Sequence, residues 1–146
     1  MIKPDFTIED FNAMNKNTLM EQLGIEYLEV KNGFVHARMP VNEKTRQPMG
    51  ILHGGSSLAL AETLGSLGSA FIVDLEKNDV RGSHMSANHL RAAKAGWVYA
   101  KAVIIHRGRN THVWNIDILD EAEQLVSTCR LTNFIIPKES KKRISE

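Results

Sequence analysis

The chain has a single cysteine, Cys129, among its 146 residues. One thiol excludes an internal disulfide and suits a protein kept in a reducing compartment. Neither sign of charge is in excess, because 18 lysines and arginines against 17 aspartates and glutamates give a net charge of +1. This balance does not indicate binding to nucleic acid or to an anionic membrane surface. The N-terminal residues lack the apolar core of a signal peptide, so we expect a cytoplasmic protein.

Two common catalytic patterns are also missing. The sequence has no Gly-x-Ser-x-Gly motif, and we interpret Gly55-Ser56-Ser57 as the first residues of a helix, which argues against serine hydrolase chemistry. None of the 6 histidines forms a close pair of metal-binding type with a cysteine or an acid on one helical face. We therefore expect no metal site. Three histidines are interpreted as ordinary strand or surface residues: His36, His84 and His112.

The most informative stretch is a glycine-rich loop, residues 47–55, that leads into an almost entirely apolar helix, residues 54–73. His53 lies at their junction, and Glu62 is the one acid of the helix. A helix that is apolar on nearly every side predicts a buried core helix, and interruptions by Glu62 and several hydroxyl groups argue against a membrane span. A buried carboxylate needs a partner or a chemical task. Two serines continue its polar stripe at helical spacing: Ser66 and Ser69.

The distance between the helix start and Glu62 limits how the two could act together. Free N–H groups in the first turn of a helix can stabilise a developing oxyanion. Glu62 lies about 12 Å along the axis from Gly54 at the standard helical rise. A carbonyl group held at Gly54 is therefore beyond the reach of Glu62 in the same chain, and a shared site would require a second subunit. Alternatively, Glu62 is a buried acid satisfied by Ser or Arg, and the glycines only shape a turn.

The rest of the chain predicts an α+β domain over residues 1–138, followed by a charged tail, residues 139–146, that we expect to be disordered. One or two short helices are expected within residues 5–23, with Leu and Met side chains covering the edge of the sheet. Short turns between the later segments predict an antiparallel sheet packed against the long helix. Its polar strand over residues 80–90 suits a subunit interface beside a site. The expected strands span residues 24–30, 34–39, 80–90, 97–106, 111–119 and 125–136.

The motif Gln47-x5-His53-Gly54-Gly55-x6-Glu62 resembles the signature of the hotdog-fold acyl-CoA thioesterases. It is similar to the branch that includes 1,4-dihydroxy-2-naphthoyl-CoA hydrolase, the enterobactin-pathway proofreading thioesterase and one type of 4-hydroxybenzoyl-CoA thioesterase. The resemblance extends over residues 20–137. It implies the hotdog fold, in which an antiparallel curved sheet wraps around one long central helix. It also implies a homodimer with shared active sites, and partly apolar outer sheet faces that allow a dimer of dimers.

The resemblance implies roles around a thioester carbonyl group. The Gly54 N–H would polarise the carbonyl oxygen, and the helix dipole would reinforce it. Glu62 of the partner chain would attack as a nucleophile or activate a water as a general base, and the sequence leaves both routes open. His53 and Gln47 would orient the carbonyl group, the leaving thiolate or the water. Ser66 would hold the water or hydrogen-bond the acyl ring.

Coenzyme A carries a 3′-phosphate and a pyrophosphate, so cationic side chains should converge near its nucleotide end. The sequence positions that match the family here are His89 and Arg91 after the polar strand, and Arg107 and Arg109 in a basic turn. Lys94 is a weaker candidate. Gly55, beside the carbonyl-binding Gly54, completes the expected substrate-binding residues.

These features predict hydrolysis of an aromatic acyl-CoA, and the leading specific function is release of 1,4-dihydroxy-2-naphthoate in menaquinone biosynthesis. No metal or redox cofactor is implied, since CoA is part of the substrate. One alternative is a hotdog 3-hydroxyacyl dehydratase, whose usual His-Phe-Pro run is absent here. Another is a non-catalytic acyl-CoA binding or sensing module. Glu62 argues against the module, because a sensor needs no buried acid.

Overall fold

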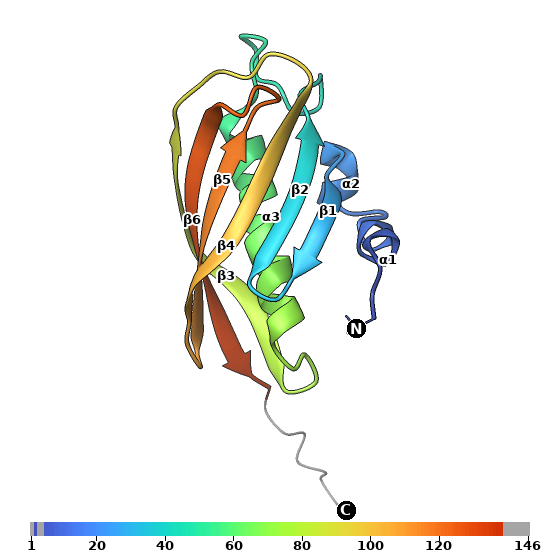
Figure 1. Cartoon of the computed structure of the whole chain (residues 1–146), viewed down its shortest axis with the longest axis vertical. Coiled ribbons are helices and arrows are strands. Elements are labelled where there is room, and N and C mark those ends of the chain that lie inside the picture. Colours follow the sequence, from blue (N-terminus) through green and yellow to red (C-terminus); the bar gives the residue numbers. More distant parts are fainter. Residues whose placement is uncertain (1, 3–4, 139–146) are drawn as a thin grey trace, which may run out of the picture.

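Figure 1 shows the computed structural model of the chain, which describes residues 2 and 5–138. A six-stranded antiparallel sheet curves around one long helix, as the α+β prediction required. The predicted tail, residues 139–146, lies outside the described residues. The elements follow in the order α1 (Ile8–Ala13), α2 (Leu19–Leu23), β1 (Glu26–Lys31), β2 (Phe34–Pro40), α3 (Gly54–Ile72), β3 (Asn78–His89), β4 (Trp97–Arg107), β5 (Thr111–Leu119) and β6 (Leu125–Pro137).

The N-terminal segment forms two short helices, as predicted. Thr7 and Asp10 make a reciprocal capping box at the start of α1. Gly24 ends α2 at φ +68°, a left-handed conformation that favours glycine. The Ile25 N–H still donates to the Met20 carbonyl oxygen at 2.9 Å, so residues 24 and 25 belong to the helix end. The prediction that the first strand begins at residue 24 was therefore two residues early.

The strand order, β1-β2-β4-β5-β6-β3, differs from the order along the chain. β3 and β4 are consecutive in sequence but do not pair, because residues 90–96 cross the end of the sheet (Figure 1). β3 instead pairs with β6, from Asn78 opposite Pro137 to His89 opposite Ser127. It forms one edge of the sheet, and its outer side has no strand partner within the described residues. The local sequence pattern could not predict this arrangement, because alternation identifies a strand but not its neighbours.

Helix α3 packs one face against the sheet. Leu60, Ala61 and Leu64 are fully buried there, and a Cβ at Gly68 would overlap the Trp114 ring. The prediction of a wholly buried helix was wrong, because side chains on its other face, Glu62 among them, remain partly or fully exposed. The sheet wraps only one side of the helix. Among the described residues, no helix combines the length and hydropathy needed to cross a bilayer.

A buried polar cluster joins α3 to β5 and β6. The Ser69 hydroxyl oxygen accepts from Trp114 Nε1 at 2.9 Å and from Asn133 Nδ2 at 3.0 Å. Both lone pairs are then occupied, so the hydroxyl donates its own hydrogen to His112 Nδ1, 3.0 Å away. His112 is therefore an acceptor at Nδ1, which requires a neutral ring. The strand interpretation of His112 is confirmed, although its side chain is buried.

Acidification is expected to destabilise the fold through His112. Burial, followed by the charges of Arg107 and His106, lowers the pKa of His112 below its ordinary value of 6.5. Below about pH 6.5 the unfolded chain takes up a proton that the folded chain resists, so this contribution to stability is complete above that pH and decreases below it. Burial also lowers the pKa of His36, so a variant that changes only one of these two histidines still loses some stability on acidification.

The test compares thermal unfolding of wild type, His112→Gln and the exposed-site control His84→Gln at mildly acidic and mildly alkaline pH. We expect Tm to fall less on acidification in His112→Gln than in the other two proteins. Circular dichroism gives each Tm. The same decrease in all three proteins would show that His112 does not carry this pH dependence.

Candidate active site

The loop before α3 keeps its shape through backbone hydrogen bonds around a tight turn. The Gln47 N–H donates to the Ile51 carbonyl oxygen and the Gly50 N–H donates to the Gln47 carbonyl oxygen, each at 2.9 Å. Gly50 has φ +77°, which favours glycine. The side-chain oxygen of Gln47 accepts from the Met49 N–H, so the NH2 group is the part of this side chain that can donate to a substrate.

His53 and two glycines form the start of α3. His53 is the N-cap residue, and its Nδ1 accepts from the Gly55 N–H at 2.7 Å. A neutral ring that accepts at Nδ1 carries its hydrogen on Nε2, so His53 can donate outward from that atom. Gly54 is the first helical residue, and its N–H has no acceptor within the part of the chain that the structure describes. This N–H is therefore free to donate to a ligand.

Gly54 lies against the end of β3. A Cβ at this position would be 2.7 Å from His89 Nε2, and His89 Nδ1 is 2.8 Å from Ser127 Oγ. A cavity of about 330 Å³ at this end of the molecule is lined by Gln47, Gly54, His89 and Arg91. The structure thus brings together four of the predicted site residues, which come from two separate segments of the chain, residues 47–54 and 89–91. Ser127 was not predicted, and only the β3–β6 pairing reveals it.

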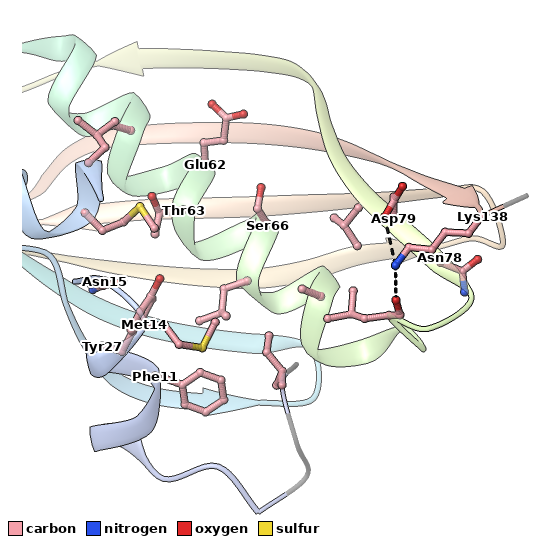
Figure 2. Close-up of a pocket in the computed structure, with 18 residues that line it drawn as sticks. Phe11, Met14, Asn15, Tyr27, Glu62, Thr63, Ser66, Asn78, Asp79 and Lys138 are labelled. Atoms are coloured by element: carbon pink, nitrogen blue, oxygen red, sulfur yellow. Dashed lines mark hydrogen bonds and ion pairs between the residues drawn. The ribbon is translucent and has the colours of Figure 1, made fainter. Parts of the chain in front are cut away.

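A larger cavity, of about 730 Å³, lies between α3 and the N-terminal helices (Figure 2). Glu62 and Ser66 border it from α3, and Figure 2 shows the Glu62 carboxylate pointing away from Phe11 and Tyr27. Burial raises the pKa of Tyr27 to about 12, so the phenol is neutral and can donate a hydrogen bond. The N-terminal part of the wall is mostly apolar: Phe11, Met14, Leu19, Met20 and Tyr27.

The N-terminal helices lie beside β1, an edge strand, as the sequence prediction placed them, and they also line this cavity. Two buried or half-buried amides hold them there. Asn12 Nδ2 donates to the Tyr27 carbonyl oxygen at 3.1 Å, and Asn15 Nδ2 donates to the Ile25 carbonyl oxygen at 2.9 Å. These bonds fix the segment beside β1, where it faces α3. The sequence showed Leu, Met and Phe side chains on short helices. Where these helices lie relative to α3 could be known only from the fold.

Glu62 is exposed in the single chain, which corrects the prediction of a buried acid. It makes no hydrogen bond or ion pair within the described residues, so the alternative of an acid satisfied by Ser or Arg is not supported. The Glu62 carboxylate instead lies against the backbone of Gly82 in β3. No three His, Cys, Asp or Glu side chains gather as metal ligands in the part of the chain that the structure describes.

Glu62 and the Gly54 N–H line different cavities of the same chain. The helical rise separates them by about 12 Å along α3. A thioester carbonyl group bound at Gly54 is therefore beyond the reach of Glu62 within the single chain. Each cavity holds only part of the predicted chemistry.

The second pair of predicted cationic residues lies elsewhere. β4 runs from Trp97, near the loop that precedes α3, to Arg107 at the other end of the sheet, about 30 Å away at the standard strand rise. Arg107 Nη1 donates to Asn32 Oδ1 at 3.2 Å, and Arg109 borders another cavity at that end. The single chain does not bring Arg107 and Arg109 together with Arg91.

Comparison with known proteins identifies the family to which this chain belongs. The chain matches the family model of the thioesterase superfamily over residues 49–127. It is 38% identical to the proofreading thioesterase EntH of Klebsiella pneumoniae, over 92% of this chain and 97% of that protein. Its structure is similar to that of a thioesterase from Haemophilus influenzae, with a TM-score of 0.89, 41% identity, and coverage of 97% of this chain and 98% of the other.

Two structures of a Staphylococcus aureus protein carry alanine substitutions that can be compared with the Gln47 to Glu62 motif. The first is 46% identical to this chain with a TM-score of 0.80, and the match covers 82% of this chain and 98% of the other. The second is 47% identical with a TM-score of 0.81, and the match covers 82% of this chain and 99% of the other. One replaces a glutamine, and the other replaces a glutamate fifteen positions further along the S. aureus chain. Gln47 and Glu62 are separated by the same interval in this chain.

The curved antiparallel sheet around one long helix is the hotdog thioesterase fold, as the sequence motif implied. The chain belongs to the thioesterase superfamily, and it is a thioester hydrolase. This finding favours the hydrolase prediction over the dehydratase and over the sensing module.

Proposed function

We propose that this protein hydrolyses aromatic acyl-CoA thioesters to the free acid and CoA, in active sites that two copies of the chain share. The leading candidate substrate is 1,4-dihydroxy-2-naphthoyl-CoA of menaquinone biosynthesis. The observation that carries the proposal is the separation of the Gly54 N–H and Glu62 into two cavities of one chain. Each cavity is incomplete for thioester hydrolysis, and a second copy supplies what the first lacks.

β3 supports a specific way of joining the two copies. Its middle contacts Glu62 through Gly82, its end contacts Gly54 through His89, and its outer side is unpaired within the described residues. In an antiparallel pair, residues equidistant from the centre face each other. Pairing of two copies of β3 centred between Met85 and Ser86 would set Gly82 of one chain opposite His89 of the other. The Glu62 carboxylate of one chain would then approach the Gly54 N–H of its partner.

In such a site the thioester oxygen accepts a hydrogen bond from the Gly54 N–H, and the positive end of the α3 dipole stabilises the oxyanion as it forms. Glu62 either removes a proton from a water that attacks the carbonyl carbon, or attacks that carbon itself to form an acyl-enzyme anhydride that water then cleaves. In both routes the carbon–sulfur bond breaks and CoA leaves as a thiolate. His53 and Gln47, each with a free donor, orient the carbonyl group, the thiolate or the water.

The acyl group would occupy the larger cavity. Its apolar wall suits an aromatic ring, and Ser66 and Tyr27 add hydroxyl groups that can recognise polar substituents on the ring. At the other end, His89 and Arg91 can face the phosphates of CoA. Gly55 leaves room for the His53 ring, because a Cβ at position 55 would lie 2.9 Å from His53 Nδ1. Arg107 and Arg109 would serve the nucleotide only if the assembly brings them close. No metal or redox cofactor is needed for this chemistry.

We also propose a cytoplasmic dimer of dimers. The lone Cys129 is buried and free, which suits a reducing compartment. Exposed apolar side chains on β4 and β6 support a second interface, because exposed apolar surface can mark a site of protein–protein contact. They are Val103, Ile105 and Phe134, with 47%, 51% and 48% of their surfaces exposed.

The test follows thiol release with a thiol-reactive dye over a panel of aromatic and aliphatic acyl-CoA thioesters. We expect aryl-CoA thioesters to be hydrolysed with the highest kcat/KM of the panel. The matching pantetheine thioesters, which lack the nucleotide phosphates, should have a higher KM. Faster turnover of aliphatic substrates would contradict the aromatic assignment. Binding of CoA thioesters without hydrolysis of any of them would contradict the proposed reaction and favour an acyl-CoA sensor.

A further inference from the structure

Gly82 occupies an unusual place in β3. Glycine weakens the interior of a strand, because it has no side chain to pack and loses more backbone entropy on folding. Four glycines in the structure have φ in the left-handed region, and Gly82 is not one of them, so its backbone conformation does not require glycine. It lies at a register shift between Gly82 and His84, where Ser83 is an extra residue in β3 relative to β6. Bulges of this kind often lie next to active sites and redirect side chains.

The space that a side chain at position 82 would fill is occupied by Glu62. A Cβ built on Gly82 would overlap Glu62 Oε1 and lie 3.4 Å from Glu62 Cδ, with Asn133 Oδ1 further away at 3.9 Å. The core glycines differ in this respect. A Cβ at Gly68 would meet the buried Trp114 ring, whereas the only close neighbour at Gly82 is the end of a flexible, exposed side chain.

We infer that Gly82 is a positioning residue for Glu62: its missing side chain forms the seat on β3 in which the carboxylate rests at the edge of the acyl cavity. This inference rests on the proposed function of Glu62. The seat sets the direction of the carboxylate, because the other rotamers of an exposed glutamate point it elsewhere. Either catalytic route requires an oxygen of Glu62 close to one atom of the substrate or water. A displacement of about 1 Å at such a site can cost on the order of 10²-fold in rate.

The Gly82→Ala variant tests the inference. Within the single chain an alanine Cβ clashes only with the Glu62 carboxylate, so the chain should fold and Glu62 should turn away. We expect kcat to fall roughly 10- to 100-fold with KM for the acyl-CoA nearly unchanged, because the substrate is held by other residues. Glu76→Ala, an exposed substitution in the loop before β3 that borders neither cavity, is the control and should keep wild-type kcat. Thermal unfolding is measured on every variant.

A double-mutant cycle separates positioning from a general effect on the strand. Aspartate is one methylene shorter than glutamate, so in Glu62→Asp the carboxylate withdraws from the space that the added Cβ of Gly82→Ala would need. We expect Gly82→Ala to cost much less activity in the Glu62→Asp background than in wild type, which is the coupling expected of two groups in contact.

Three results would overturn the inference: wild-type kcat in Gly82→Ala, an equal cost of Gly82→Ala in both backgrounds, or loss of folding in Gly82→Ala. The last would assign Gly82 to the stability of β3. Failure of the proposed function is visible separately, as full activity in Glu62→Gln whatever residue stands at position 82.

Discussion

Replacing Glu62 by glutamine is expected to lower kcat for aryl-CoA thioesters by roughly 10²- to 10⁴-fold, the range over which a positioned acid or base acts. Glutamine has the size of glutamate, but it neither attacks a carbonyl carbon nor removes a proton from water. Glu62 is exposed and makes no hydrogen bond or ion pair within the described residues, so the substitution removes no stabilising contact. We therefore expect KM and Tm to stay close to their wild-type values.

Thiol-release kinetics and thermal unfolding measure these quantities. The matched control is Glu76→Gln, an exposed acid in the loop between α3 and β3 that borders neither cavity. It loses the same charge and should keep wild-type kcat. Undiminished turnover by Glu62→Gln would exclude both the nucleophilic and the general-base roles. A loss of kcat with retained binding of the CoA thioester would place Glu62 in the chemical step.

Replacing Gly54 by proline is expected to lower kcat by roughly 10²- to 10³-fold, the cost of removing one donor to an oxyanion. Proline lacks the N–H and is well accommodated at the first position of a helix. The residue before it must be extended, and His53 already has φ −71° and ψ 132°. A local cost is contact with the His89 ring, whose Nε2 would be 2.7 Å from a Cβ at position 54.

Circular dichroism should show that Gly54→Pro folds, and thiol release gives its kcat. The matched control is Gly54→Ala, which makes the same contact with His89 but keeps the N–H. Alanine should therefore lose less activity than proline. Equal losses would assign the effect to displacement of His89 and would argue against carbonyl binding by the Gly54 N–H.

The same two variants test whether the active site is shared. After joint unfolding and refolding of equal amounts of Glu62→Gln and Gly54→Pro, half of the dimers carry one chain of each kind. In a shared site, each mixed dimer regains one intact site of two, so activity should rise to about a quarter of the wild-type value. A mixture no more active than its parts would indicate that each chain builds its own site.

Local sequence signals account for most of the elements. Thr7 caps the start of α1, Gly24 ends α2, and Asn32-Gly33 forms the turn between β1 and β2, so the signals that bound these elements act over a few residues. Strand boundaries fall within about two residues of the predictions, because alternation of apolar and polar side chains needs no distant partner. The Gln47 to Glu62 motif likewise identified the family.

Contacts between distant segments were beyond these signals. Nothing near β3 in the sequence predicts that it pairs with β6, that Gly82 lies against Glu62, or that His89 lies against Gly54. The exposure of Glu62 was predicted wrongly for the same reason. The apolar sequence of α3 predicts burial on all sides of the helix. Only the fold shows that the sheet covers one side.

The sequence by itself determined the class of protein, because the residues of the motif lie close together along the chain and carry their chemistry with them. It also determined the separation of Gly54 from Glu62, since a helix has a constant rise per residue. The tertiary structure alone decided which cavity each group enters, which strand is left at an open edge, and why Arg91 and Arg107 lie at opposite ends of the sheet. Strand order and helix packing depend on contacts between residues far apart in the chain, and no local pattern encodes those contacts one by one.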